Sequence, residues 1–153
     1  MEIICRNSAE TEKVGRLLGL HAHNGDVFCL SGDLGAGKTL LCRGLAVAQG
    51  VDPAAVTSPT FTLMNVYQGR QLELRHFDLY RLNKPEELQD IGFAEYAGGD
   101  GITMIEWADM FPEEMPDAYL QITLTLIPEG RKITLLPHGK RYEELVKEAI
   151  VPC

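Results

Sequence analysis

The chain has 153 residues, a length that suits a single domain with its own hydrophobic core. With 45% hydrophobic and 24% charged residues it has the composition of a soluble globular protein, and no apolar run reaches the roughly 20 residues that cross a bilayer. The 14 basic and 22 acidic residues give a net charge of −8, which argues against a protein that grips RNA or DNA alone, because that binding requires neutralised phosphates. We therefore expect one domain over residues 1–153, cytoplasmic and without signal peptide, membrane span or strong nucleic-acid binding of its own.

The N-terminal third predicts a strand, a helix, a second strand and a second helix. Residues 1–5 suit a short strand, and Ser8 suits the cap of a following helix because its hydroxyl can accept a bond from a free helical N–H group. The continuous apolar run 27–30 predicts a strand buried on both faces. Residues 39–49 then keep helical spacing, and Gly50 is placed to end that helix.

The rest of the chain is richer in strands. Five are predicted from apolar or alternating residues, over 61–67, 71–77, 102–105, 119–127 and 132–136. The first two join around Gly69 as a hairpin, a short helix opens at Pro85, and residues 143–150 form a last helix. Together with the phosphate-binding motif G-x-x-x-x-G-K-[ST] at residues 32–39, these elements predict an α/β fold of the P-loop NTPase type, with a mixed, mostly parallel sheet, helices on both faces and an antiparallel hairpin element.

The segment 32–39, Gly-Asp-Leu-Gly-Ala-Gly-Lys-Thr, matches the phosphate-binding pattern G-x-x-x-x-G-K-[ST], between a predicted strand and a predicted helix. Its glycines allow the backbone N–H groups to point together at a phosphate chain, at the positive end of the helix. Lys38 adds a full positive charge, and the Thr39 hydroxyl is a ligand that Mg²⁺ accepts. The segment predicts a nucleotide site.

Such a site needs a carboxylate at a strand end, and the sequence offers two candidates. Glu106 follows the strand 102–105, and Asp78 follows the strand 71–77, although a single strand-end acid is more often a helix cap or a surface charge. The hydroxyls of segment 57–61 either sense the γ-phosphate or belong to an ordinary proline turn. Trp107 either stacks on a base or fills the core. Guanine specificity is not expected, because Asn83-Lys84-Pro85-Glu86 only approximates N-K-x-D and no D-x-x-G occurs.

Four blocks in this order and spacing resemble the TsaE family: the phosphate loop, Ser58-Pro59-Thr60-Phe61, the segment 76–82 (H-F-D-L-Y-R-L) and Ile105-Glu106-Trp107. The similarity runs from about residue 8 to residue 131. It implies a small ATPase that binds ATP or ADP with Mg²⁺ and hydrolyses ATP weakly alone. It further implies a role with TsaB and TsaD, the proteins that transfer a threonylcarbamoyl group to the tRNA adenosine next to the anticodon. By this resemblance the ATPase does not transfer the group itself.

The loop motif and the resemblance together assign roles by position. The resemblance implies that Thr39, Glu106 and Asp78 serve the metal, that Lys38, Asp78, Glu106 and Thr60 serve catalysis, and that 58–60 is a mobile switch. The nucleotide-binding residues would be Thr11, Asp33, Leu34, Gly35, Ala36, Gly37, Lys38, Thr39, Leu40, Trp107 and Arg131. The source of an arginine finger stays open between Arg81 and a partner.

A small-molecule kinase with the same phosphate loop is the main alternative. Such kinases usually carry an arginine-rich lid, whereas arginines are sparse after Lys38 and the central segment predicts a hairpin. A non-hydrolysing scaffold is a third possibility, against which the complete set of loop lysine, loop threonine and two strand-end acids argues.

Overall fold

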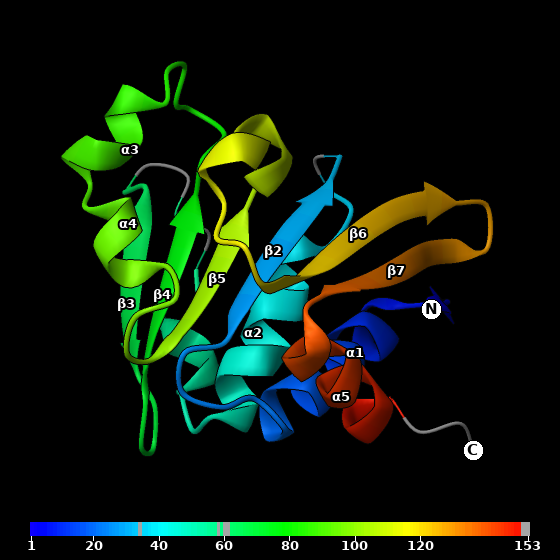
Figure 1. The fold of residues 1–153 in the computed structure, drawn as a ribbon. Coiled ribbons are helices and arrows are strands. Elements are labelled where there is room, and N and C mark those ends of the chain that lie inside the picture. The colour runs from blue at the N-terminus through cyan, green and yellow to red at the C-terminus, as the bar shows by residue number, and fades with distance from the viewer. Residues whose placement is uncertain (34, 58, 60–61, 151–153) are drawn as a thin grey trace.

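The computed structural model describes residues 1–33, 35–57, 59 and 62–150. Across these residues a seven-stranded sheet has the order β1-β7-β6-β2-β5-β4-β3 (Figure 1). Its strands are β1 (Glu2–Cys5), β2 (Val27–Gly32), β3 (Met64–Gln68), β4 (Glu73–Asp78), β5 (Ile102–Glu106), β6 (Tyr119–Ile127) and β7 (Gly130–His138). The helices are α1 (Ser8–Leu20), α2 (Lys38–Ala48), α3 (Glu86–Asp90), α4 (Phe93–Tyr96) and α5 (Lys140–Ala149), with three short 3₁₀ turns at Pro53–Ala55, Ala108–Met110 and Pro112–Glu114.

The middle of the sheet is parallel and its margins are antiparallel. Strands β6, β2, β5 and β4 run in one direction, while β3 pairs antiparallel with β4, and β7 pairs antiparallel with both β6 and β1. Strand β2 is buried from Val27 to Ser31, as its apolar run predicted, because it lies between two parallel neighbours with helices on either side. The predicted mixed sheet with an antiparallel hairpin element is confirmed.

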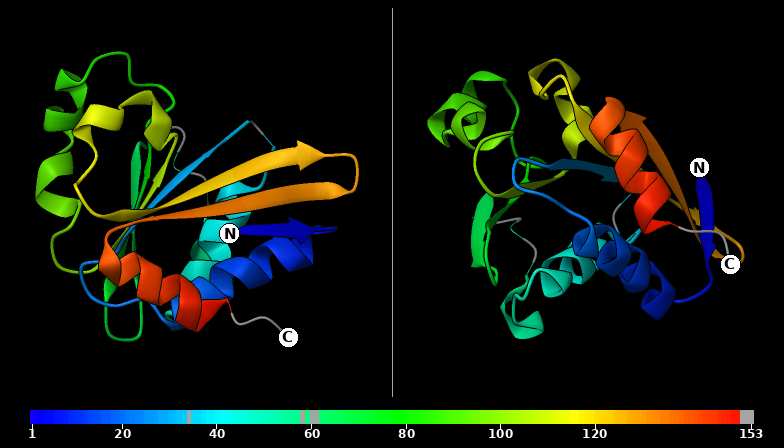
Figure 2. Two further views of the ribbon diagram at one scale, coloured as in Figure 1. Left: turned by 45° about the vertical axis from the view of Figure 1, so that its right-hand side comes forward. Right: turned by 60° about the horizontal axis from the view of Figure 1, so that its bottom comes forward.

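Helices cover both faces of the sheet, also as predicted. One core joins α1, α2 and α5 to the sheet, and the other lies under α3, α4 and the turn after β5. Alternate residues of β2 serve the two cores: Phe28 packs in the first and Cys29 in the second. In both views of Figure 2, α1 and α2 lie side by side. No helix in the described part of the chain has the length and apolar character that a membrane span requires.

Several boundaries differ from the sequence prediction. Ser8 does not cap α1: the side chain of Asn7 accepts the N–H of Glu10 at 2.9 Å, so Asn7 is the cap and Ser8 is the first helical residue. Asparagine caps a helix as well as serine does, and the sequence held both in succession. Strand β3 begins at Met64 rather than at 61, since Leu63 has a φ of 67° that no strand accepts. Helix α5 begins three residues before the predicted 143, and the one-turn helix α4 was not predicted.

Candidate nucleotide-binding site

The candidate site lies at the carboxyl ends of β2, β5 and β4, which are neighbours in the sheet. The register pairs Leu30 with Glu106 and Glu106 with Asp78, so the two strand-end acids are adjacent where the phosphate loop leaves β2. Ligands of open α/β sheets bind at this edge, because the loops that follow parallel strands all meet there. The topology therefore brings together three features that lie up to 74 positions apart in the sequence: the loop from residue 32, Asp78 and Glu106.

The phosphate loop is held between α1 and β7. Gly37 precedes α2 with a φ of 104°, a conformation that favours glycine. A Cβ atom on Gly37 would lie 3.3 Å from Nε of Arg131 and 3.4 Å from Cγ2 of Thr11, so these side chains flank the loop closely. Arg131 also donates from Nη2 to the carbonyl of Gly35 at 3.3 Å, while its Nε is buried with no hydrogen-bond partner among the described residues. An unpaired guanidinium N–H beside the loop suits an anionic ligand.

The ammonium of Lys38 is enclosed by its own loop. It donates to the carbonyls of Gly32 at 2.5 Å and Asp33 at 3.0 Å, and it lies 4.1 Å from the ring centroid of Trp107. Burial lowers the pKa of this amine, while the nearby carboxylates of Glu106 and Asp78 oppose that shift. These bonds satisfy the cation within the loop, and a phosphate group can take their place without leaving the charge unpaired.

Thr39 and Glu106 form the most direct pair of the site. The Thr39 hydroxyl lies 3.1 and 3.0 Å from the two carboxylate oxygens of Glu106, which is itself 3% exposed. A hydroxyl and a carboxylate this close are oxygen donors of the kind that Mg²⁺ prefers, and Asp78, 3% exposed on the adjacent strand, adds a third. The residues present therefore fit the predicted magnesium ion.

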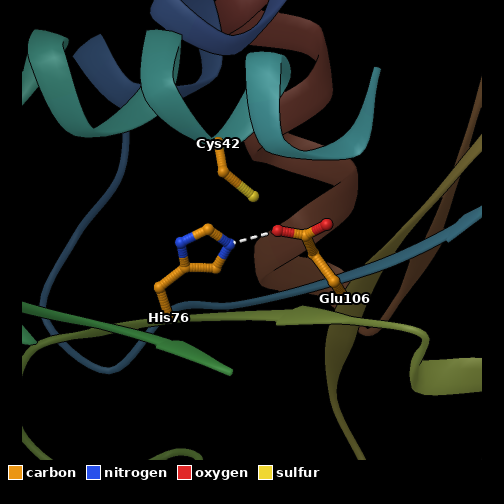
Figure 3. Close-up of side chains that lie close together, drawn as sticks. All are labelled: Cys42, His76 and Glu106. Carbon is orange, nitrogen blue, oxygen red and sulfur yellow. Dashed lines mark hydrogen bonds and ion pairs between the residues drawn. The ribbon is translucent and has the colours of Figure 1, made fainter. Parts of the chain in front are cut away.

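Behind Glu106 lies a second pair of buried side chains (Figure 3). His76 from β4 places its Nε2 atom 2.5 Å from Oε2 of Glu106. The Cys42 thiol from α2 points at these two side chains, His76 and Glu106. The three donor atoms lie within 4.8 Å of one another, close enough to hold a metal ion. Burial, however, raises the pKa of the Cys42 thiol well above its usual value, whereas a metal-bound cysteine is a thiolate. We interpret Cys42 as packing over the His76–Glu106 pair.

A cavity of about 300 Å³ opens in front of these residues. Asp78 lines it and accepts the backbone N–H of Tyr80 at 3.0 Å, and the Tyr80 ring lies 4.8 Å from that of Trp107. Its lining holds Gly35, Gly37, Lys38, Thr39, Leu40, Asp78, Tyr80, Glu106, Trp107 and Arg131. Every one of these except Tyr80 belongs to the site predicted from the sequence.

The other predicted residues lie elsewhere or outside the described part of the chain. Thr11 is fully buried behind the loop, where its hydroxyl is 3.5 Å from the carbonyl of Asn7, and Ala36 is buried under the loop. The Asp33 side chain is exposed beside a neighbouring hollow rather than in the cavity. Nucleotide contact stays a prediction for these three, as it does for the residues that line the cavity. Leu34, Ser58, Thr60 and Phe61 lie outside the described residues.

Sequence reasoning had given no role to His76 or Tyr80. The signal for His76 was present: it stands two positions before Asp78 in an alternating strand, so both side chains face α2 and the loop. Tyr80 lies beyond the strand, where periodicity gives no direction. Only the three-dimensional structure brings its ring beside Trp107 in the cavity lining.

A phosphate-loop motif between a buried parallel strand and a helix, with carboxylate side chains at the ends of the next strands, defines a P-loop α/β protein. A family model described as "Threonylcarbamoyl adenosine biosynthesis protein TsaE" matches residues 5–133. The chain belongs to the TsaE family.

Similar proteins support this family assignment. The tRNA threonylcarbamoyladenosine biosynthesis protein TsaE of Bacillus subtilis is 40% identical over 143 residues, which cover 93% of this chain and 89% of that protein. The TsaE protein of Treponema pallidum is 40% identical, over 88% of this chain and 99% of its own length. The TsaE protein of Haemophilus influenzae is also 40% identical, over 78% of this chain and 75% of its own length. The crystal structure of Bacillus subtilis YdiB superimposes with a TM-score of 0.78 at 34% identity, covering 97% of this chain and 91% of the other.

Proposed function

We propose that this protein is an ATP hydrolase required for the threonylcarbamoyladenosine modification of tRNA. In this proposal it binds ATP with Mg²⁺ and acts on TsaB and TsaD through its ATP cycle, and it does not transfer the threonylcarbamoyl group. Family membership supports the pathway. One observation carries the ATPase proposal: Lys38, Thr39, Asp78 and Glu106 converge on a single cavity at the amino end of α2.

Different residues of the cavity would bind the phosphates, hold the metal ion and orient the attacking water. The N–H groups at the start of α2 and the amine of Lys38, once it exchanges its loop carbonyls for phosphate oxygens, would hold the β- and γ-phosphates. Thr39 and Glu106 would hold Mg²⁺, which would neutralise negative charge on the phosphates. Asp78 stands on the next strand, where its carboxylate can orient the attacking water and accept its proton.

Basal hydrolysis should be slow. Arg131 is the arginine among the described cavity-lining residues, and its Nη2 is held by the Gly35 carbonyl. A group that stabilises charge on the transferring phosphate can add about 10³-fold or more to the rate. A partner protein that supplies or releases such a group would therefore stimulate turnover strongly.

The test measures phosphate release from ATP-Mg²⁺ by the purified protein, with and without TsaB and TsaD, together with modification of tRNA by the mixture. Lys38→Ala should lower stimulated phosphate release about 100-fold or more, because it removes the charge that meets the phosphates. Lys147→Ala, at an exposed position of α5, is the matched control and should change nothing.

Two results would overturn the proposal. Phosphate transferred to a small molecule instead of water would favour the kinase alternative. Unchanged tRNA modification and phosphate release in Lys38→Ala would show that the loop does not act on ATP.

A further inference from the structure

A chain of hydrogen bonds leads from Glu106 away from the cavity and through the protein. Oε2 of Glu106 lies 2.5 Å from Nε2 of His76, and Nδ1 of the same ring lies 3.1 Å from the Tyr67 hydroxyl. That hydroxyl lies 3.1 Å from the backbone carbonyl of Thr57, to which it can donate. We call these four residues, Glu106, His76, Tyr67 and Thr57, the Glu106–Thr57 relay.

The two central residues of the relay, His76 and Tyr67, lie on neighbouring strands and are buried, whereas Thr57 at its end is exposed. His76 is fully buried on β4 and Tyr67 is 5% exposed on β3, the antiparallel neighbour, with ring centroids 6.0 Å apart. Asn65, the register partner of His76, donates to the carbonyl and to the hydroxyl of Thr57 at 3.2 and 3.3 Å. The backbone at Thr57 is therefore held by two adjacent side chains of β3.

Burial gives these bonds consequences that surface bonds lack. A buried polar group is costly to leave without a partner, so the buried members of the relay constrain one another. The carboxylate of a glutamate turns through a broad torsional range and needs partners to fix it. Thr39 and His76 supply those partners for Glu106, one on the cavity side and one on the protein side.

We propose that His76 and Tyr67 are positioning residues, which orient Glu106 for Mg²⁺ and couple its position to the backbone at Thr57. The inference rests on the proposed function, since it takes Glu106 as a metal ligand. Thr57 directly precedes the segment 58–60 that the sequence analysis predicts as a switch. A shift of the Glu106 carboxylate on binding Mg²⁺ would thus reach the backbone at Thr57 through His76 and Tyr67.

The chain offers a matched pair of substitutions to test this coupling. Tyr67→Phe removes the hydroxyl of the relay and keeps the ring. Tyr142→Phe is its control: Tyr142 is equally buried at 4% exposure, and its hydroxyl accepts the N–H of Val27 at 2.9 Å, at the opposite end of β2 from the phosphate loop. Each variant removes one buried tyrosine hydroxyl and keeps its ring, so Tyr142→Phe reports what the loss of such a hydroxyl does away from the site.

The first measurement is ADP binding at increasing Mg²⁺ concentrations. Its readout is the fluorescence of Trp107, the only tryptophan in the sequence, which lines the cavity. His76→Leu should raise the half-saturating Mg²⁺ concentration about tenfold or more, as loss of an outer partner of a metal ligand does, and Tyr67→Phe about threefold. His76→Gln keeps a donor amide and should recover part of the loss. Tyr142→Phe should match the wild type.

The second measurement needs no nucleotide. Amide hydrogen exchange around residue 57 should be at least threefold faster in Tyr67→Phe than in Tyr142→Phe, since only the first removes one of the two side-chain donors that hold the Thr57 carbonyl. Equal Mg²⁺ dependence and equal exchange in these two variants would overturn the relay while leaving the ATPase proposal standing. Nucleotide binding by the wild type that ignores Mg²⁺ would instead reject Glu106 as a metal ligand, and with it both proposals.

Discussion

Single residues at the site show how buried charges are kept paired within the protein. The Lys38 ammonium is bound by two carbonyls of its own loop, and the Glu106 carboxylate by the Thr39 hydroxyl and the His76 ring. Because both ions are already paired, the site does not carry the cost of an isolated buried charge while it waits for a ligand. Ligand binding then becomes an exchange of partners for Lys38.

Another buried titratable residue predicts a pH dependence of stability. Cys29 lies fully buried in β2, and burial raises the pKa of its thiol to about 12, against about 8.5 for a free cysteine. Between these values the native state keeps a proton that the unfolded chain releases, so the free energy of unfolding falls as the pH rises. For this thiol the loss by pH 10 is about 2 kcal/mol.

Urea unfolding of the wild type and of Cys29→Ala at pH 7, 9 and 10 measures this contribution. The variant should be less stable at pH 7, by about 1–2 kcal/mol, because it leaves a small cavity. It should nevertheless lose less stability than the wild type on going to pH 10, since Cys29 no longer ionises on unfolding. Parallel curves for the two proteins would contradict the buried-thiol explanation.

At the scale of elements, the close contact of α1 with α2 fixes where the phosphate loop begins its helix. Glycines occur at the crossing: a Cβ atom on Gly15 would lie 2.1 Å from the Leu41 carbonyl oxygen, and one on Gly44 would lie 2.1 Å from that of Glu12. Neither position can hold a side chain without moving a helix. Because α2 also begins with Lys38 and carries Thr39, the crossing positions two site residues.

Gly44→Ala should therefore lower the free energy of unfolding by about 1–3 kcal/mol, despite the better helix propensity of alanine, because the helices must separate. It should also weaken nucleotide binding through the displaced α2. Urea unfolding and ADP titration check both effects, with Lys13→Ala at an exposed position of α1 as the control within about 0.5 kcal/mol. If Gly44→Ala keeps wild-type stability and nucleotide binding, the crossing of α1 and α2 has space for a methyl group and the explanation is wrong.

The same elements show what a sequence can predict. Helix α2 and strand β2 were predicted within two residues at either end, since a continuous apolar run and a loop motif mark them. Helix α4 was not, because four residues give no period, and its Phe93 is buried against Phe77 by tertiary packing. The helix start at Asn7 was missed by one residue, a choice that the geometry of a single side chain decides.

At the scale of the whole molecule, sheet order decides which residues meet. The sequence could predict the loop, Asp78 and Glu106 from local context, but not that β5 would lie between β2 and β4 and make the two acids neighbours. Arg131 reaches the loop from β7, which is two strands away from β2 in the sheet. Long-range pairing of this kind leaves no local signal. Arg131 was predicted from the family resemblance alone, and the structure shows that it lies beside the phosphate loop.

The net charge of −8 leads to a prediction about the molecule as a whole. Binding of tRNA by the isolated protein should be weaker than about 10⁻⁴ M at physiological salt, the weak end of non-specific association, because too few basic groups are available to displace counterions. Fluorescence anisotropy of labelled tRNA at 50 and 200 mM salt measures this, first with the protein alone and then with TsaB and TsaD added. Tight binding that appears only with those proteins would place tRNA recognition on the partners. Micromolar binding by the protein alone that weakens steeply with salt would instead reveal a local basic surface strong enough to outweigh the overall charge.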